Sequence, residues 1–379
     1  MTNDIIENKY ISLFLLHALG DTIGFKNSDW PIIYNKEASL DTISERIFEF
    51  IELGGVNGID LKDWSISDDT LFHITIAKSI LKYKNIINNT FILNVKNNMI
   101  SMNNKIVNEK EKYGINRFVD IITTKYIQKF TKDKDSRNYD YDPISDGAGA
   151  ATRNLCIGLA FYKEDNLDTL IDMSITLSKL THNSPHGFLA GLTSAYFVSL
   201  AIREIDIIKW PFMLIELVES DKIKKYINFQ NNNEFLDYIS YIRYWRKYLD
   251  TRFVDYKPIK SRSINNMIFR VKYYYENFVK DTQYGVIGNS GYCTMIVVYD
   301  ALLDCDGKWE KIIFYSILYP GITDTIGAIA GGLYGAIYEF GDVPQKMLFY
   351  LEEKKQLLKL GKQFYKKYYK FDLTNDITL

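Results

Sequence analysis

Proline and cysteine are scarce in this chain of 379 residues, and neither sign of charge dominates. Only 7 prolines are present, which leaves room for long helices because proline breaks helix interiors. The three cysteines, Cys156, Cys293 and Cys305, show no CxxC or other ligand-like spacing. This pattern argues against a disulfide framework and indicates a reducing compartment. With 46 basic and 47 acidic residues, the net charge of −1 gives no basic excess that would favour nucleic acid as a partner.

A membrane-spanning run is also missing from the first 20 residues. The apolar run of residues 10–20 is too short to span a bilayer, and residues 1–4 lack the basic start of a secretory signal. We therefore expect a cytoplasmic monomer with no membrane partner. Hydrophobic residues make up 47% of the chain, which is enough for one large core or for two domains.

Apolar residues recur at helical intervals along most of the chain. Leu71, Ile74 and Thr75 follow this spacing, as do the apolar residues of 312–317. Strand signals are scarce, and Asn57-Gly58 lacks the alternating flanks of a hairpin. No internal repeat or clear linker divides the chain. The sequence therefore predicts an all-α protein with a single domain over residues 1–379.

Two polar stretches refine this expectation. Residues 101–115 are rich in Asn, Lys and Glu, and we expect a loop there. Residues 343–368 carry many charges with helical spacing, and they predict one final helix.

Two clusters of acidic and hydroxyl-bearing residues stand far apart in the chain. Residues 67–70 read Ser-Asp-Asp-Thr, and residues 323–325 read Thr-Asp-Thr. Each cluster opens a segment of helical periodicity, so capping alone would explain either one. Adjacent carboxylates beside hydroxyls are also what hard cations such as Mg²⁺ or Mn²⁺ prefer as ligands. Taken as a pair, the clusters predict a metal site built from oxygen ligands.

Glycine-rich turns supply further candidates. Residues 146–153 form a small-residue turn before a helix, which suits an anion such as phosphate. Arg153 at its end has two interpretations, pairing with phosphate or with a buried acid. Residues 20–24 read Gly-Asp-Thr-Ile-Gly, which is either a glycine C-cap or a close approach of backbone to a ligand.

Residues 181–187 place His182 and His186 on either side of a proline. Packing at a helix junction and metal binding both remain open for them, although the hard-ligand clusters elsewhere argue against a metal here. The small residues of 321–335 predict a closely packed, buried helix, with Asp324 at its N-terminal end.

Four ordered segments together resemble the ADP-ribosylglycohydrolase family, whose members remove ADP-ribose from proteins. They are Trp64 to Thr70, Gly149 to Leu159, Thr181 to Leu189 and Thr323 to Gly331. The resemblance extends over almost the whole chain and is closest to the ADP-ribosylarginine hydrolase branch. It implies an all-helical orthogonal bundle with two Mg²⁺ or Mn²⁺ ions.

The resemblance also implies roles for individual residues. Catalysis would fall to Asp68, Asp69 and Asp324. The metal ligands would be these three acids together with Ser67 and Thr325. The substrate-binding residues would be Gly147 and Gly149 near the diphosphate, His182 at the rim, and Ser290, Gly291 and Tyr292 on the nucleotide side.

The chain departs from the family pattern at three places. Ile322 stands where the family carries the first acid of its second cluster, and Pro31 stands where this branch carries a glutamate, with Asp29 nearby. Residues 290–295 lack the His-Asp pair that the family carries after its Ser-Gly, and this segment is one residue shorter than in the family.

Two functional hypotheses follow from the resemblance and its departures. The first is metal-dependent hydrolysis of the N-glycosidic bond between ADP-ribose and a protein side chain, with arginine favoured. The second is a homologue that binds ADP-ribose without turnover. Either way, the expected partner is an ADP-ribosylated protein or free ADP-ribose. A purely structural helical protein is a third reading.

Overall fold

Helices make up almost all of the regular secondary structure, which confirms the predicted all-α class. The computed structural model describes residues 2–30, 39–82, 87–132, 139–227, 229–259, 266–280, 282 and 285–370. The α-helices within these ranges are α1 (Thr2–Phe25), α2 (Leu40–Glu52), α3 (Gly55–Gly58), α4 (Asp68–Lys82), α5 (Asn89–Tyr113), α6 (Ile121–Lys132), α7 (Gly149–Ala160), α8 (Leu167–Ser178), α9 (Pro185–Ile202), α10 (Trp210–Glu219), α11 (Asp221–Lys224), α12 (Asn232–Arg252), α13 (Met267–Phe278), α14 (Gly291–Asp304), α15 (Trp309–Ser316), α16 (Thr323–Tyr338) and α17 (Lys354–Phe364). Short 3₁₀ turns η1 (Lys26–Ser28), η2 (Glu164–Asn166), η3 (Ile207–Lys209) and η4 (Gln345–Leu348), a π-turn η5 (Tyr365–Lys370), and the antiparallel pair β1 (Phe253–Val254) and β2 (Lys257–Pro258) complete the set.

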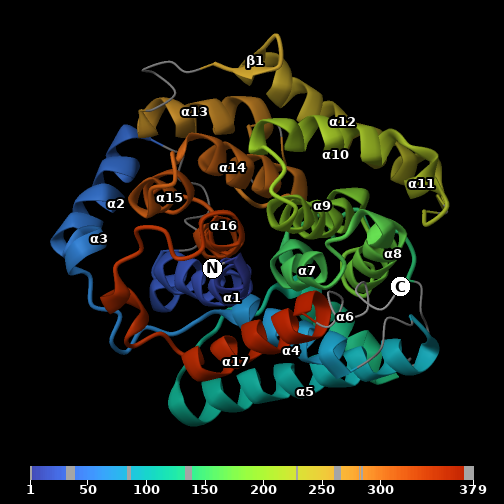
Figure 1. Ribbon diagram of the computed structural model, residues 1–379, viewed down its shortest axis with the longest axis horizontal. Coiled ribbons are helices and arrows are strands. Elements are labelled where there is room, and N and C mark those ends of the chain that lie inside the picture. Colours follow the sequence, from blue (N-terminus) through green and yellow to red (C-terminus); the bar gives the residue numbers. More distant parts are fainter. Residues whose placement is uncertain are drawn as a thin grey trace.

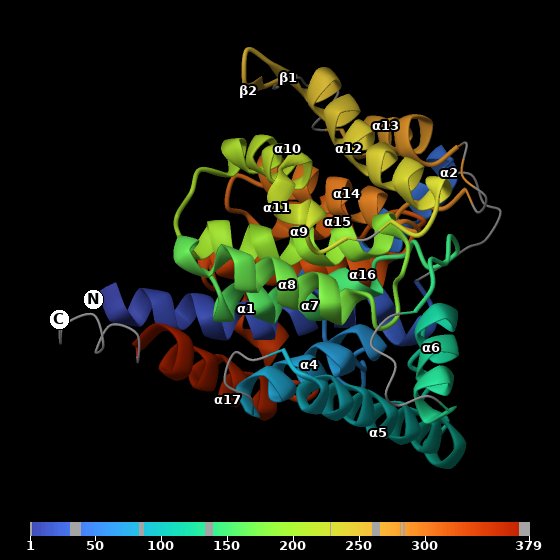
Figure 2. The same cartoon turned by 90° about the vertical axis from the view of Figure 1, so that its right-hand side faces the viewer.

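The helices are arranged around a central pair. Helices α1 and α16 lie side by side in the middle of the molecule, with α7 and α9 next to them (Figure 1). Helices α4, α5 and α17 cover one side of this centre, and α12 and α13 lie on the opposite side (Figure 2). Buried apolar side chains from Tyr10 to Tyr368 form one connected hydrophobic core.

Glycines let the central pair approach closely. A Cβ atom at Gly20 would lie 2.0 Å from the carbonyl oxygen of Gly327, and one at Gly24 would lie 2.2 Å from that of Thr323. No side chain fits at such distances, so glycine is required at both positions. The Thr323 hydroxyl also donates to the Gly24 carbonyl at 2.7 Å. This contact fixes the C-terminal part of α1 beside the N-terminus of α16, where Asp324 lies.

Helix α9 belongs to the interior. Among the described residues it is the one helix long and apolar enough to cross a membrane, yet 94% of that stretch is buried inside the protein. Burial on all sides explains its uniformly apolar sequence, because a helix in the core needs no polar face.

Two sequence predictions about helix boundaries were wrong. Residues 101–113 continue α5, which ends only at Gly114, whose backbone is left-handed (φ 70°). The polar side chains there cover a largely exposed face while residues such as Ile106 remain buried. The expected single helix over 343–368 is interrupted, and α17 begins after Glu353, which has a left-handed φ of 57°.

Four buried charges connect α12, α13 and α14. Arg252 and Arg270 each pair with both Asp300 and Asp304, and all four side chains are at most 6% exposed. Each carboxylate therefore faces two guanidinium groups, so the cluster is electrically balanced within the fold.

Candidate functional site

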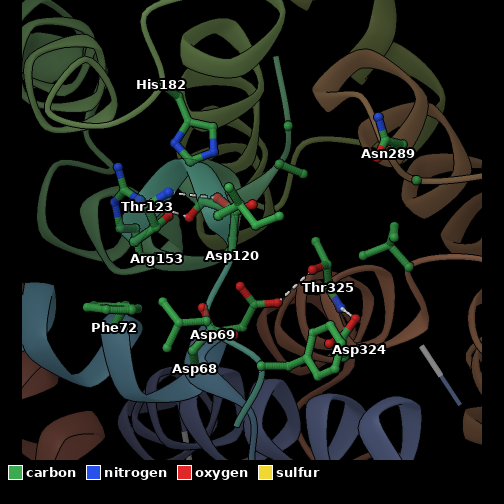
Figure 3. Close-up of a pocket in the computed structure, with 18 residues that line it drawn as sticks. Asp68, Asp69, Phe72, Asp120, Thr123, Arg153, His182, Asn289, Asp324 and Thr325 are labelled. Atoms are coloured by element: carbon green, nitrogen blue, oxygen red, sulfur yellow. Dashed lines mark hydrogen bonds between the residues drawn. The ribbon is translucent and has the colours of Figure 1, made fainter. Parts of the chain in front are cut away.

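A cavity of about 170 Å³ lies where the N-termini of α4, α6, α7 and α16 meet (Figure 3). These helices come from distant parts of the sequence, so only the fold brings their first residues together. The lining residues are Asp68, Asp69, Phe72, Phe118, Val119, Asp120, Ile121, Thr123, Gly147, Ala148, Gly149, Arg153, His182, Gly288, Asn289, Ile322, Asp324 and Thr325.

The first acidic cluster occupies the start of α4. Asp68 and Asp69 are each 7% exposed and line the cavity. Ser67 accepts the Asp69 N–H on its hydroxyl at 3.1 Å, so it caps the helix. Ser67 is fully buried and does not line the cavity, so the capping interpretation describes it better than a direct ligand role.

Asp21 supports this turn from behind. Its Oδ2 accepts the backbone N–H groups of Ser67 at 3.1 Å and Thr70 at 3.3 Å, and it also accepts the Thr70 hydroxyl. Burial, together with the charge of Asp69, raises the pKa of Asp21 to about 7. The glycine segment of residues 20–24 thus carries an acid that holds the start of α4 in place.

The second cluster meets the first through hydroxyl groups. The Thr325 hydroxyl donates to Asp69 Oδ2 at 2.7 Å, and the Thr152 hydroxyl donates to Asp69 Oδ1 at 2.9 Å. The Thr325 N–H donates to Asp324 Oδ1 at 2.8 Å. Residues separated by 256 positions therefore form one hydrogen-bonded group, and Figure 3 shows Asp68, Asp69 and Asp324 on the same side of the cavity.

Arg153 is the cation in the lining of this cavity, and it balances the charge of these acids only in part. Burial raises the pKa of Asp68 and Asp324 well above the ordinary value, and the charge of Asp69 adds to the effect. Burial also raises the pKa of Asp69 to about 6, although its two threonine donors act in the opposite direction. Carboxylates that are buried and repel one another favour a bound cation or protonation.

The donor chemistry of this group fits a hard cation. Its carboxylate and hydroxyl oxygens are the ligands that Mg²⁺ and Mn²⁺ prefer. The Asp68 carboxylate accepts no hydrogen bond from the described residues and borders the cavity. The positions of these side chains do not form a closed metal site, however. No three His, Cys, Asp or Glu side chains in the described ranges are placed to hold one metal ion together.

Arg153 is the buried cation of the cavity wall, and most of its donors are used within the protein. It donates to the carbonyl oxygens of Gly149 and Leu177, at 3.2 Å each, and to the Thr181 hydroxyl at 2.6 Å. Burial lowers its pKa to about 10. The pairing of Arg153 with a buried acid is not seen as a direct contact, since Arg153 instead connects α7 with the end of α8.

His182 and the glycine turn form the wall opposite the acids. The His182 ring lies 3.1 Å from where a Cβ on Gly149 would be, and Gly147 also borders the cavity. The Thr181 hydroxyl lies 2.7 Å from His182 Nδ1, and burial lowers the pKa of His182 well below its ordinary value. His182 is therefore a neutral wall residue, while His186 contacts Ser240 outside the cavity lining.

The sequence matches a known protein family over nearly its whole length. The profile of the ADP-ribosylglycohydrolase family matches residues 2–372. The chain belongs to this family. It is 31% identical over 351 residues to the ADP-ribosylhydrolase ARH1 of Dictyostelium discoideum, covering 87% of each protein.

Two further matches agree with this assignment. A protein of Acanthamoeba polyphaga mimivirus, provisionally named an ADP-ribosyl glycohydrolase, is 30% identical over 335 residues, which are 86% of this chain. The match spans only 63% of the viral protein's length. A solved structure titled "ADP-ribosylglycohydrolase-related protein complex" has the same fold, with a TM-score of 0.57 and 14% identity, covering 96% of this chain and 99% of that one.

The departures from the family pattern can now be located. Ile322 lines the cavity directly before α16, so an apolar side chain stands beside Asp324. Pro31 lies outside the described residues. Asp29 pairs with Lys26 at 3.6 Å and does not line the cavity, so it does not fill the place of an acid there.

The structure places Ser290, Gly291 and Tyr292 outside the lining of this cavity, and their predicted role in substrate binding stays a prediction. Tyr292 is 2% exposed, and its ring stacks on Tyr244 at 3.8 Å between centroids. A Cβ atom at Gly291 would lie 2.2 Å from the His186 carbonyl, so Gly291 serves the packing of α14 on α9. The cavity is instead lined by the two preceding residues, Gly288 and Asn289, while Ser290 borders a neighbouring cavity.

Asp120 and Phe118 are site residues that the sequence did not predict. Both line the cavity, and both are exposed at its mouth, directly before α6. Asp120 Oδ2 accepts the Thr123 N–H at 2.9 Å, which is ordinary helix capping. An acid three residues before a threonine was the only local signal, and it did not indicate that this turn approaches Asp68.

Proposed function

We propose that the protein hydrolyses the N-glycosidic bond between ADP-ribose and a protein side chain, with arginine as the favoured linkage. The proposal rests mainly on one observation. Asp68, Asp69 and Asp324 line one cavity, and Thr325, the neighbour of Asp324, donates a hydrogen bond to Asp69. Membership of the ADP-ribosylglycohydrolase family supports the same bond class.

The reaction requires water to replace the leaving side chain. The water oxygen bonds to the anomeric carbon of the ribose, the carbon–nitrogen bond breaks, and the proton passes to the leaving nitrogen. Asp68, Asp69 and Asp324 are not placed to hold one ion together, so they would share two Mg²⁺ or Mn²⁺ ions, which supply Lewis-acid and templating chemistry when bound. Thr152 and Thr325 fix the orientation of the Asp69 carboxylate, which can then accept hydrogen bonds from ribose hydroxyls in a defined direction.

The wall opposite the acids suits the rest of the ligand. Bare glycine backbone at Gly147 and Gly149 lies at the start of α7, where helix N–H groups favour a phosphate. The neutral His182 ring closes this side without adding charge. The proposed substrate therefore spans the cavity from the diphosphate near α7 to the ribose near α4 and α16.

A direct test is the release of ADP-ribose from an ADP-ribosylarginine protein across a Mg²⁺ titration. We expect release that requires the metal and that disappears in Asp69→Asn. ADP-ribose at about 100 times its dissociation constant should also stabilise the protein by roughly 2.7 kcal/mol. Absence of both release and stabilisation, with and without metal, would contradict the proposal.

A second candidate function is ADP-ribose binding without turnover. Ile322 favours it, because an isoleucine beside Asp324 offers no oxygen ligand where the family carries an acid. Loss of a metal ligand or of its supporting partner commonly reduces affinity or activity at least about tenfold. Stabilisation by ADP-ribose without release at any metal concentration would support this alternative.

A further inference from the structure

The two adjacent acids at the start of α4 are held in place in different ways. The Asp69 carboxylate accepts the hydroxyl groups of Thr152 at 2.9 Å and Thr325 at 2.7 Å, so its own side chain is fixed. The Asp68 carboxylate accepts no hydrogen bond from the described residues, although it borders the same cavity. The position of Asp68 therefore depends on the backbone that carries it.

That backbone is held by two residues from distant parts of the chain. Glu352 Oε2 accepts the Ile66 N–H at 3.0 Å, and Arg117 Nη1 donates to the Ile66 carbonyl at 2.7 Å. The Arg117 carbonyl accepts the Asp68 N–H at 3.2 Å. The first N–H groups of a helix have no partner within the helix, so this last bond supplies one that α4 lacks. Both ends of the stretch 66–68 are thus fixed from outside.

Arg117 and Glu352 also fix each other. Arg117 Nη1 and Nη2 donate to the two carboxylate oxygens of Glu352, at 2.9 Å and 2.7 Å, and Arg117 Nε donates to Glu109 at 2.9 Å. A bidentate pair of this kind fixes orientation as well as adding energy. The Arg117 side chain is only 2% exposed, whereas that of Glu352 is 33% exposed. The guanidinium therefore has one defined position behind the start of α4.

The shape of the guanidinium matters here more than its charge. Its donors lie in one plane at fixed angles, and in Arg117 they serve Glu352, Glu109 and the Ile66 carbonyl at once. The ammonium group of a lysine is a point charge and cannot bridge three acceptors in this arrangement. The next residue, Phe118, has a left-handed backbone (φ 57°), and such strain persists where the surrounding contacts enforce it.

We infer that Arg117 and Glu352 are positioning residues for the metal site, which hold the backbone of residues 66–68 so that the Asp68 carboxylate faces the cavity. The inference rests on the proposed function, because it concerns the acids that would share the Mg²⁺ ions. Neither residue lines the cavity, so both act through Asp68. The segment directly before α17 thereby becomes part of the machinery of a site that it does not touch.

The simpler interpretation is that this ion pair only attaches the C-terminal segment to the rest of the protein. Breaking it would then lower the free energy of unfolding without changing metal binding. Glu353→Ala is the matched control, because it removes one negative charge at the same junction. Glu353 pairs with Lys105 at 3.6 Å and accepts a hydrogen bond from Gln356, and neither contact involves residues 66–68.

Two variants test the inference, each measured in three ways. Glu352→Ala removes the acceptor of the Ile66 N–H, and Arg117→Lys keeps the charge but loses the planar set of donors. Hydrogen exchange of the metal-free protein, read by mass spectrometry, should show residues 66–70 exchanging about tenfold faster in both variants, as loss of a charged hydrogen bond predicts. Glu353→Ala should leave this segment unchanged. Urea denaturation in parallel gives the stability of each variant.

The third measurement is the Mg²⁺ dependence. We expect the Mg²⁺ dissociation constant from titration calorimetry to rise about tenfold in Glu352→Ala and Arg117→Lys, the size typical for loss of a residue that orients a metal ligand. The Mg²⁺ concentration for half-maximal release of ADP-ribose from an ADP-ribosylarginine protein should rise by the same factor. Glu352→Gln keeps an oxygen for the Ile66 N–H, so its values should lie between those of Glu352→Ala and the wild type.

The outcomes separate the inference from the proposed function. If Glu352→Ala and Arg117→Lys lower stability but leave the exchange of residues 66–70 or the Mg²⁺ dissociation constant unchanged, the positioning role is wrong. The same holds if Glu353→Ala has an equal effect. Release of ADP-ribose by the wild type would leave the proposed function standing in both cases. If the wild type neither binds Mg²⁺ nor releases ADP-ribose, the proposed function is wrong, and the inference fails with it.

Discussion

Two groups of buried acids in this protein differ in how their charge is balanced. In the first, Asp300 and Asp304 on α14 each face the guanidinium groups of Arg252 and Arg270. Burial alone would raise the pKa of Asp300, but the charges of Arg270 and Arg252 hold it below the ordinary value. This group is complete within the fold and needs no further ligand.

In the second group, Asp68, Asp69 and Asp324 are buried to a similar degree but face one another. Arg153 is the cation that borders the same cavity, and most of its donors are used by backbone carbonyls and a hydroxyl. The pKa of each of the three acids is consequently raised by burial and, for Asp68 and Asp324, by mutual repulsion as well.

The comparison shows that burial alone does not reveal the role of a charged group. Paired charges stabilise a specific packing, and removing one partner is strongly unfavourable. Uncompensated carboxylates lower stability unless a cation or proton joins them, so their persistence points to a function. The direction of the pKa shift separates the two cases in this fold.

The largest effect is expected in the balanced group. Asp300→Asn removes the charge that Arg252 and Arg270 share and should lower the free energy of unfolding by about 3–5 kcal/mol. Urea denaturation followed by far-UV circular dichroism would measure it. Asp250→Asn, an exposed position on α12, the helix that carries Arg252, should change stability by no more than about 0.5 kcal/mol. A loss in Asp300→Asn as small as in this control would mean that the cluster is not structural.

A substitution at Ile322 tests the second group of acids by adding a carboxylate to it. With metal bound, Ile322→Asp adds an oxygen ligand beside Asp324 and should increase Mg²⁺ affinity or release of ADP-ribose about tenfold. Without metal, the new carboxylate adds repulsion and should destabilise the fold. Measurements of stability and of ADP-ribose release across a Mg²⁺ titration would distinguish these two outcomes.

Ile51→Asp is the control for this substitution, because Ile51 is 56% exposed and does not line the cavity. It should leave the metal dependence unchanged. A loss of stability in Ile322→Asp with no gain in metal binding or release would indicate a chain that has abandoned catalysis.

Much of this architecture was predictable from sequence. Helical periodicity and the scarcity of proline predicted the all-α class, which the structure confirms. Hydroxyl-flanked acids at two helix starts predicted that residues 67–70 and 323–325 would lie together, and the bond from Thr325 to Asp69 joins them. These patterns are local, so the sequence displays them directly.

The remaining features depend on contacts that local patterns do not encode. Asp120 is a common type of helix cap, and the turn that carries it is held at the cavity by contacts distant in sequence, such as the pair of Arg117 with Glu352, 235 positions away. Tyr292 was assigned to the site by resemblance, but the stacking on Tyr244 draws it into the core. The shift of the cavity wall to Gly288 and Asn289 follows from where α14 begins, which sequence patterns locate poorly.

The smallest expected change is a gain in stability, opposite in sign to the loss expected for Asp300→Asn. Asp324→Asn removes one of the repelling charges, so the ligand-free variant should be more stable than the wild type by about 1 kcal/mol near neutral pH. Because the pKa of Asp324 is raised on folding, its protonated form stabilises the wild type fully below the ordinary value of 3.8, and this contribution is lost as pH rises through the folded-state pKa.

The advantage of Asp324→Asn should therefore vanish in acid, whereas the disadvantage of Asp300→Asn should persist until pH falls through the lowered pKa of Asp300, below 3.8. Urea denaturation of both variants across this range would measure the two profiles. Asp324→Asn should also lose the stabilisation by Mg²⁺ and the release of ADP-ribose. If it is less stable than the wild type at every pH, then Asp324 is balanced within the fold, and the distinction between the two groups of acids fails.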